Sequence, residues 1–226
     1  MARPLRILVT AFGPFPGVPV NPSQRAAADV LRLRRPALAG VEIVLRILPT
    51  RWDELPRLKA LMAEQAFDAV LLMGVAARRR HVCLEARAVN AARAFPDAVG
   101  KHPPRRRLAP READAVSSAA PVLPWTAALR RDGIAARASR DAGLYLCNAA
   151  YFHALAAAQG RMPGNGAVPP VLFLHLPGRT GVPRGASRAS LARALSGLLV
   201  ALAAEARRRN ACGSGPGRGA PRSRPS

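Results

Sequence analysis

The sequence predicts an α/β protein, built as a single-domain α/β/α sandwich with a mostly parallel central sheet. Short apolar, β-branched runs alternate in its N-terminal part with stretches whose apolar positions recur at helical spacing. Strand, helix, strand, helix, strand is the order expected of a parallel sheet that is covered on both faces. The 226 residues are 50% hydrophobic, which is enough for one substantial core. No repeat or break in composition divides residues 1–207, so we expect one domain there.

The N-terminal elements follow from local patterns. Residues 5–12 are apolar and β-branched, which predicts a strand, and the glycines and prolines of 13–17 predict a loop after it. Asn21 and Ser23 are good helix caps, so we expect a helix over 24–33. The next elements expected are strands at 41–48 and 68–73, with a helix at 52–66 between them and Gly74 at the end of the second strand.

The C-terminal half begins with a segment rich in proline and charge, residues 100–123, which we expect to be an exposed excursion. The elements expected after it are a helix at 124–131, a short strand at 133–138, a helix from Cys147 past Phe152, a strand at 171–175 and an amphipathic helix at 187–207. Glycine, proline, serine and arginine dominate from there on. Residues 208–226 are therefore predicted to be a disordered basic tail.

The net charge of +22 comes from 35 Lys plus Arg against 13 acids, and only Lys59 and Lys101 are lysines. Such a charge attracts polyanions without choosing among them, so nonspecific polyanion binding is expected and a basic nucleic-acid-associated protein is one candidate function. An arginine-rich composition spread over solvated faces explains the charge equally well. An aromatic content of 4% and the lack of a nucleic-acid-binding motif argue against base recognition.

The three cysteines, Cys83, Cys147 and Cys212, are too few and too far apart for a disulfide framework, and none forms a CxxC pair. Reduced thiols fit a cytoplasmic protein. No secretory leader or uninterrupted apolar span of about 20 residues is present, so we expect no membrane association. The histidines show no metal-ligand spacing, so neither a metal nor a cofactor is expected.

Three residues have the chemistry of a thiol peptidase. Cys147 precedes a predicted helix, whose N-terminal partial positive charge favours a thiolate. His175 ends a predicted strand, and Glu85 follows the strand that ends at Gly74. The carboxyl ends of parallel strands are where an open α/β sheet gathers its site residues. Taken singly, each residue also has a purely structural explanation, as a buried thiol, a strand-end histidine or a surface carboxylate.

Four sequence blocks favour the catalytic interpretation of these three residues over the structural one. The first block is Val9-Thr10-Ala11-Phe12-Gly13-Pro14-Phe15 with Asn21-Pro22-Ser23, and the second runs from Gly74 through Glu85 to Asn90 with Pro96-Asp97. The third is Ser139-Arg140-Asp141-Ala142-Gly143-Leu144-Tyr145-Leu146-Cys147-Asn148, and the fourth is Phe173-Leu174-His175-Leu176-Pro177. Together and in this order they resemble pyroglutamyl peptidase I, a family of cysteine peptidases that remove an N-terminal 5-oxoproline. The third block is the most specific of the four.

The resemblance implies a Cys-His-Glu triad, with Cys147 as nucleophile, His175 as general base and acid, and Glu85 as the group that orients the imidazole. It implies that Phe12 and Phe15 form apolar walls for the lactam ring, and the alternative is that both are core aromatics. The substrates implied are peptides with an N-terminal pyroglutamate. A homo-dimer or tetramer is also implied, and the catalytic domain would span residues 1–207.

The chain departs from the family pattern at its arginines. Arg78–Arg80 replace a glycine-rich turn, and Ala86 stands where the family has an arginine after the glutamate. Arg93 is our candidate for a further family arginine that assists at the substrate, but it is two residues out of step. An arginine-lined mouth would favour peptides with an acidic residue after the lactam. A family member that binds lactam peptides without cutting them is the remaining alternative.

Overall fold

The computed structural model describes residues 3–15, 17–160, 168–178 and 180–212. Its centre is a six-stranded sheet in the order β2-β1-β3-β8-β4-β7. Strands β1 (Leu5–Phe12), β2 (Val41–Leu48), β3 (Ala69–Ala76) and β8 (Val171–Pro177) run parallel, whereas β4 (Val82–Glu85) pairs antiparallel with β8 and parallel with β7 (Ala136–Ser139). The predicted mostly parallel sheet is confirmed.

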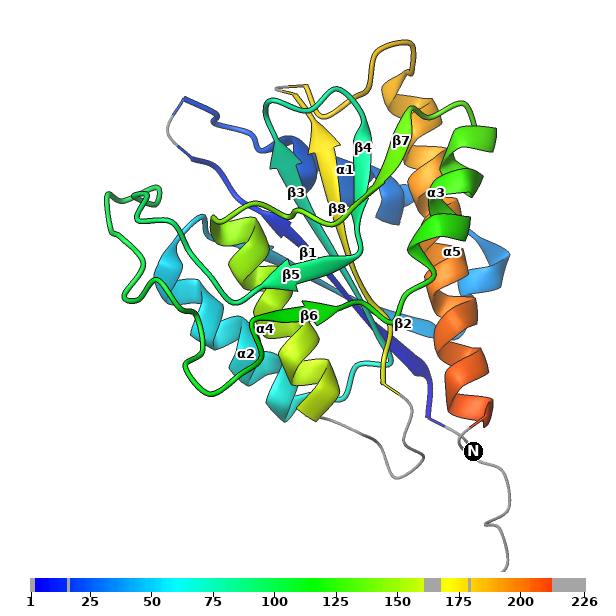
Figure 1. The fold of residues 1–226 in the computed structure, drawn as a ribbon. Coiled ribbons are helices and arrows are strands. Elements are labelled where there is room, and N and C mark those ends of the chain that lie inside the picture. Colours follow the sequence, from blue (N-terminus) through cyan, green and yellow to red (C-terminus); the bar gives the residue numbers. More distant parts are fainter. Residues whose placement is uncertain (1–2, 16, 161–167, 179, 213–226) are drawn as a thin grey trace, which may run out of the picture.

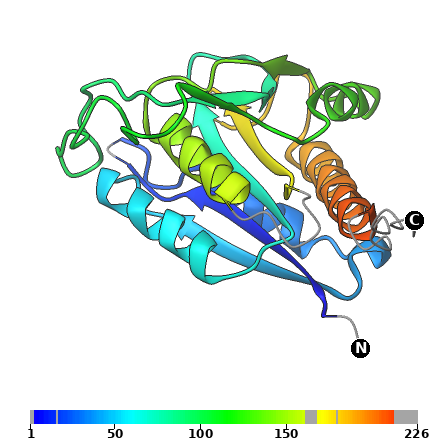
Figure 2. The same cartoon turned by 60° about the horizontal axis from the view of Figure 1, so that its bottom comes forward.

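Helices cover both faces of the sheet (Figures 1 and 2). One face carries α1 (Pro22–Arg32), α3 (Val122–Arg131) and α5 (Arg188–Cys212), and the other carries α2 (Leu55–Glu64) and α4 (Leu146–Gly160). The short elements are two 3-10 turns, Pro36–Leu38 and Trp52–Glu54, and an antiparallel ribbon of β5 (Arg87–Val89) with β6 (Ala115–Ser117). The result is the α/β/α sandwich that the sequence predicts.

Several predicted boundaries need correction. The helix expected at 52–66 is a 3-10 turn followed by α2, and the excursion expected at 100–123 contains β6, which pairs with β5. The tail was expected to begin at 208, but α5 continues to Cys212. The side chain of Arg209 explains this extension, because it donates to Glu205 and to the carbonyls of Val168 and Ala119. The rest of the predicted tail lies outside the described residues.

Helix α5 is long and apolar enough, by length and composition alone, to cross a membrane. Most of its apolar stretch is buried inside the molecule. Leu195, Leu199 and Leu202 pack in the cluster that α1 and α3 also line. In this structure α5 is therefore a core helix.

Strand alternation decides which side chains reach the face of α4. On β8, Leu172, Leu174 and Leu176 point toward α5, whereas Phe173 packs in the cluster lined by α2 and α4. Because successive side chains of a strand point to opposite faces, His175 shares the face of Phe173. His175 is paired with Gly74 of β3 on one side and with Cys83 of β4 on the other, so these three positions form a row across the sheet.

Candidate active site

The nucleophile candidate, Cys147, is the second residue of α4. The next residue, Asn148, is wholly buried and fixes the start of this helix on β5. Its side chain accepts a hydrogen bond from the Val89 N–H at 2.9 Å and donates to the carbonyls of Val89 and Ala91 at 2.8 and 3.0 Å. These bonds hold the thiol at the N-terminal end of α4, where the partial charge of the helix is positive.

Gly74 provides the space for the sulfur. A Cβ atom at this position would lie 2.8 Å from the Sγ of Cys147 and 2.9 Å from the Cζ of Phe173. The sulfur thus sits directly against β3, beside the residue that pairs with His175. Neighbouring strands are about 4.8 Å apart, so the register brings the thiol and the imidazole together on one face of the sheet.

Glu85 and His175 are in direct contact. The carboxylate is wholly buried, and its Oε1 lies 2.8 Å from the imidazole Nδ1. Because a carboxylate can only accept, Nδ1 carries the proton and Nε2 is left with a lone pair. The ring of His175 also packs on Phe173, with centroids 4.7 Å apart. The hydroxyl of Tyr151 donates to the Glu85 carbonyl at 2.7 Å and anchors the end of β4.

A third side chain, Arg79, joins this pair. Its Nη1 donates to the same Oε1 of Glu85 at 2.5 Å, and its Nη2 donates to the carbonyl of Asp141. Arg79 lies in the turn between β3 and β4, where its own N–H donates to the Ala76 carbonyl at 2.9 Å. The carboxylate therefore receives one hydrogen bond from a cation and one from the imidazole.

The electrostatic setting keeps the thiol of Cys147 protonated in the free site. Burial raises its pKa to about 12, and the negative charge of Glu85 adds to the rise. The N–H groups of Val75 and of Cys147 itself, together with the charge of Arg79, act in the opposite direction. A nucleophile in this state needs a base to remove its proton as it attacks.

A cavity of about 440 Å³ opens in front of the sulfur. This volume falls in the usual range for small-ligand sites. Its lining is mostly apolar: Phe12, Phe15, Asn21, Thr50, Val75, Ala77, Phe95, Pro96, Asp97, Ala98, Tyr145, Leu146 and Cys147. Cys147 lines the cavity, whereas His175 and Glu85 are not among its lining residues.

One part of the cavity lining consists of the aromatic side chains of Phe95 and Tyr145, together with the buried carboxylate of Asp97. Tyr145 makes edge-to-face contacts with Trp52 and Phe95, at centroid distances of 5.4 and 5.6 Å. Its hydroxyl donates to the carbonyl of Pro96 at 2.9 Å. Burial by itself would raise the pKa of Asp97, but the N–H groups of residues 52, 99 and 101 all donate to its carboxylate and hold that pKa below its ordinary value.

The loop after β1 also lines the cavity. The Gly13 carbonyl, at the start of this loop, accepts from Asn21 at 3.0 Å and from Thr50 at 3.1 Å. Phe12 is buried at the end of β1, and Phe15 is half-buried in the loop; both line the cavity. The two phenylalanines thus occupy the positions expected of pocket walls.

Of the site residues predicted from the sequence, all but Arg93 lie at the triad or in the cavity lining. Glu85 and His175 are in contact, the Cys147 sulfur lies beside Gly74 on the same face of the sheet, and the two phenylalanines line the adjoining cavity. Arg93 is exposed and is not among the lining residues, although its N–H donates to the Leu144 carbonyl at 2.8 Å. Sequence reasoning missed the contact of Arg79 with Glu85. It also missed Trp52, which is not a lining residue but packs edge-to-face on Tyr145 and donates its main-chain N–H to Asp97.

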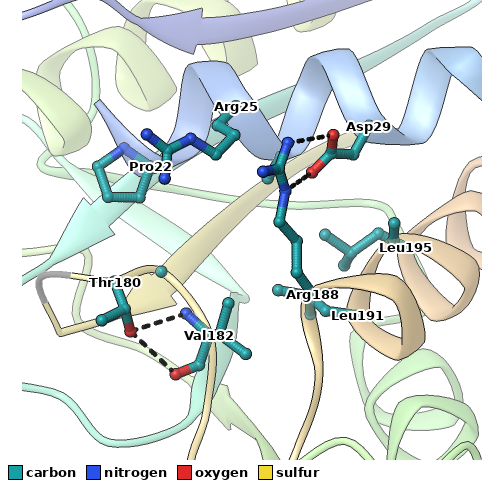
Figure 3. Close-up of a pocket in the computed structure, with 11 residues that line it drawn as sticks. Pro22, Arg25, Asp29, Thr180, Val182, Arg188, Leu191 and Leu195 are labelled. Atoms are coloured by element: carbon teal, nitrogen blue, oxygen red, sulfur yellow. Dashed lines mark hydrogen bonds and ion pairs between the residues drawn. The ribbon is translucent and has the colours of Figure 1, made fainter. Parts of the chain in front are cut away.

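A second cavity, of about 210 Å³, lies between α1, α5 and the loop after β8 (Figure 3). Arg188 of α5 makes a bidentate ion pair with Asp29 of α1 at its side, and Leu191 and Leu195 contribute apolar surface. None of the sequence-derived site residues lines it. Within the described ranges, no group of three His, Cys, Asp or Glu side chains is arranged to hold a metal ion.

Comparisons with known proteins identify relatives over most of the chain. The sequence profile described as pyroglutamyl peptidase matches residues 5–205. The pyrrolidone-carboxylate peptidase of Streptococcus suis is 34% identical over 175 residues, covering 76% of this chain and 78% of that protein. The protein of the same name from Deinococcus radiodurans is 38% identical over 181 residues, covering 78% and 79%. The crystal structure of Bacillus amyloliquefaciens pyroglutamyl peptidase I superposes with a TM-score of 0.74 at 26% identity, covering 89% of this chain and 98% of that one.

Proposed function

The chain belongs to the pyroglutamyl peptidase family of cysteine peptidases, which remove an N-terminal pyroglutamyl residue, and we propose that Cys147, His175 and Glu85 carry out this reaction. The observation that carries the proposal is the row formed by the buried Glu85–His175 pair and the Cys147 sulfur beside Gly74. Nucleophile, base and orienting carboxylate are the three parts that thiol catalysis requires.

The first half of the reaction forms a thioester. The Nε2 of His175 takes the proton of the Cys147 thiol as the sulfur attacks the pyroglutamyl carbonyl carbon. Negative charge then develops on the carbonyl oxygen, and the N–H groups of Val75 and Cys147, which already face the sulfur, are the donors placed to stabilise it. The imidazolium of His175, held by Glu85, protonates the departing amine as the C–N bond breaks.

The second half regenerates the enzyme. His175 accepts a proton from a water molecule, whose oxygen attacks the thioester carbonyl. The C–S bond breaks, the sulfur recovers a proton from the imidazolium, and free pyroglutamate leaves. Glu85 accepts from the Nδ1–H throughout and keeps the ring oriented, so that Nε2 faces the reacting atoms.

The cavity suits a neutral lactam. A five-membered lactam ring presents two flat apolar faces. The aromatic lining residues Phe12, Phe15, Phe95 and Tyr145 supply apolar surface for them. Its amide edge needs a polar partner pair, and backbone groups at the cavity rim can provide one. An unmodified N-terminal residue carries an ammonium charge, which a mostly apolar cavity disfavours because desolvating it is costly.

Release of a fluorescent amine from a pyroglutamyl conjugate tests the function. Wild-type protein should hydrolyse this conjugate but not the matching prolyl conjugate, which lacks the lactam carbonyl. Cys147→Ala should lose the activity, whereas Cys83→Ala, at a buried thiol next to the triad, should keep most of it. Binding of the conjugate by wild-type protein without any turnover would instead identify a non-cutting binder.

The charge of +22 supports a second, nonspecific property. We propose that the protein associates with polyanions and that this association weakens steeply as salt concentration rises. Peptidase activity on a neutral conjugate should be unaffected by added nucleic acid. A strong effect of nucleic acid on turnover at physiological salt would show that the two properties are coupled.

A further inference from the structure

We propose that Arg79 is a positioning residue of this peptidase: it fixes the Glu85 carboxylate, and through it the ring of His175, and ties both to the segment that carries the nucleophile. The inference rests on the proposed role of the triad. It adds a fourth side chain, which holds Glu85 and the Asp141 carbonyl rather than the reacting atoms themselves.

Geometry is the first argument. One guanidinium reaches two separate elements, because Nη1 donates to Glu85 of β4 and Nη2 to the Asp141 carbonyl of the loop before α4. The base of the side chain is also held, since the Arg79 N–H closes the turn onto Ala76. A planar guanidinium with several fixed donors makes such a bridge, whereas a lysine ammonium is a single point of contact.

Burial is the second argument. Glu85 is wholly inaccessible to water, and its Oε2 has no hydrogen-bond partner among the described residues. The carboxylate therefore depends on the two donors at Oε1, which are Arg79 and His175. Removing one partner of a buried ion pair leaves an uncompensated charge, which is costly. Without Arg79, the imidazole alone would have to hold this carboxylate.

The loop contact extends the effect to the nucleophile. Asp141 sits in a tight turn, in which its N–H donates to the Ser139 hydroxyl at 3.1 Å and its carboxylate accepts from the Gly143 N–H at 2.9 Å. This turn leads into α4 and Cys147. Arg79 therefore couples the position of the triad carboxylate to that of the sulfur.

Arg79 also places a positive charge on the carboxylate that pairs with His175. The titratable or charged groups around the Glu85–His175 pair come from four elements, namely Arg79 of the β3–β4 turn, Cys83 of β4, Arg137 of β7, and Cys147 and Tyr151 of α4. Among the described residues, only Arg79 and His175 form ion pairs with Glu85. Loss of the arginine charge should favour the imidazolium and raise the pH at which His175 becomes a base.

The test compares Arg79→Met, Arg79→Lys and the control Arg80→Met, which removes an exposed arginine next in sequence. For each variant, kcat and KM on a neutral pyroglutamyl conjugate are measured across pH. The pH dependence of alkylation of Cys147 by iodoacetamide, followed by peptide mapping, supplies a reading that needs no substrate. This second measurement separates the role of Arg79 from the choice of substrate.

Arg79→Met should lower kcat about 100-fold with little change in KM, because its effect is misplacement of catalytic groups. The acid limbs of the kcat profile and of the alkylation profile should both shift to higher pH, by about one pH unit. Arg79→Lys keeps the charge, so its acid limb should stay near that of wild type while kcat falls about tenfold. Arg80→Met should match wild type in every reading.

Two results would overturn the proposal. One is an Arg79→Met enzyme whose kcat and acid limb equal those of wild type or of the Arg80→Met control. The other is an Arg79→Lys enzyme with the kcat of wild type. This second result overturns the proposal even if Arg79→Met does not fold. If wild type cleaves no pyroglutamyl conjugate, the proposed function fails, and the alkylation profiles still decide whether Arg79 sets the state of the Cys147–His175 pair.

Discussion

Replacing Gly74 with alanine would put a methyl group into the narrowest gap of the site. The new Cβ would lie 2.8 Å from the Cys147 sulfur and 2.9 and 3.2 Å from two ring atoms of Phe173. Ordinary contacts between non-bonded heavy atoms are about 3.5–4.0 Å. The sulfur, the ring or the strand must therefore retreat by roughly 1 Å. The ring is packed against His175, so moving it disturbs the base as well.

The expected effect on catalysis is larger than the effect on folding. A displacement of about 1 Å in reacting groups costs about 100-fold in rate. Overpacking of a core costs about 1–3 kcal/mol, and the lower backbone entropy of alanine in the unfolded chain returns about 0.4–1 kcal/mol. The net destabilisation should therefore be about 0–3 kcal/mol, with a fall in Tm of about 2–4 °C for each kcal/mol.

Gly197→Ala is the matched control. Gly197 lies in α5, and a Cβ there would meet nothing within 4 Å. The substitution should stabilise the helix by about 0.5–1 kcal/mol and leave kcat unchanged. Steady-state kinetics on a pyroglutamyl conjugate and thermal denaturation measure both effects. Wild-type kcat in Gly74→Ala, with a Tm no lower than that of wild type, would refute the claim that the sulfur is packed against β3.

Two further predictions concern charge. Asp97→Asn should destabilise the fold by about 1–3 kcal/mol, because the amide cannot accept from all three N–H groups. Since the folded-state pKa of Asp97 lies below its ordinary value, the contribution of the carboxylate is present above the unfolded pKa of about 3.9 and is lost as pH falls through the folded pKa. The Tm difference between wild type and Asp97→Asn, measured from neutral pH into acid, should therefore narrow below about pH 4; a constant difference would contradict this. Pyroglutamyl-aspartate should be cleaved faster than pyroglutamyl-alanine at low salt, because the net charge of +22 attracts an acidic residue after the lactam. Equal rates on the two peptides would contradict this electrostatic preference.

Local patterns in the sequence were sufficient to predict the long parallel strands of the main sheet, because these strands are apolar and β-branched. The strand at 41–48 and the start of the strand at 171 agree with β2 and β8 as observed. Strand β4 was missed because its four residues follow a run of arginines and are held by pairing with β7 and β8, which lie far away in the sequence. The ribbon of β5 and β6 was missed for the same reason.

The candidate site was predictable at the level of residues but not of contacts. The sequence blocks identified Cys147, His175 and Glu85 by resemblance, because the order and composition of these blocks are specific. The partners of those residues depend on strand register and on side-chain reach across the sheet. Arg79 therefore looked like one member of a basic turn, and Gly74 looked like the end of a strand, although each touches a member of the triad.

The arginine excess has a structural use that composition cannot reveal. Three arginines from different elements donate to main-chain carbonyls of β7 and of the loop that joins it to the nucleophile helix: Arg130 to residue 136, Arg87 to residue 140 and Arg79 to residue 141. Strand β7 is an edge strand, and the loop after it has few strand partners, so guanidinium donors take the place of a sheet ladder there. Lysine offers no planar fork for such contacts. An interpretation of the charge as either a polyanion-binding field or a set of solvated faces therefore overlooks arginines that hold the segment leading to Cys147.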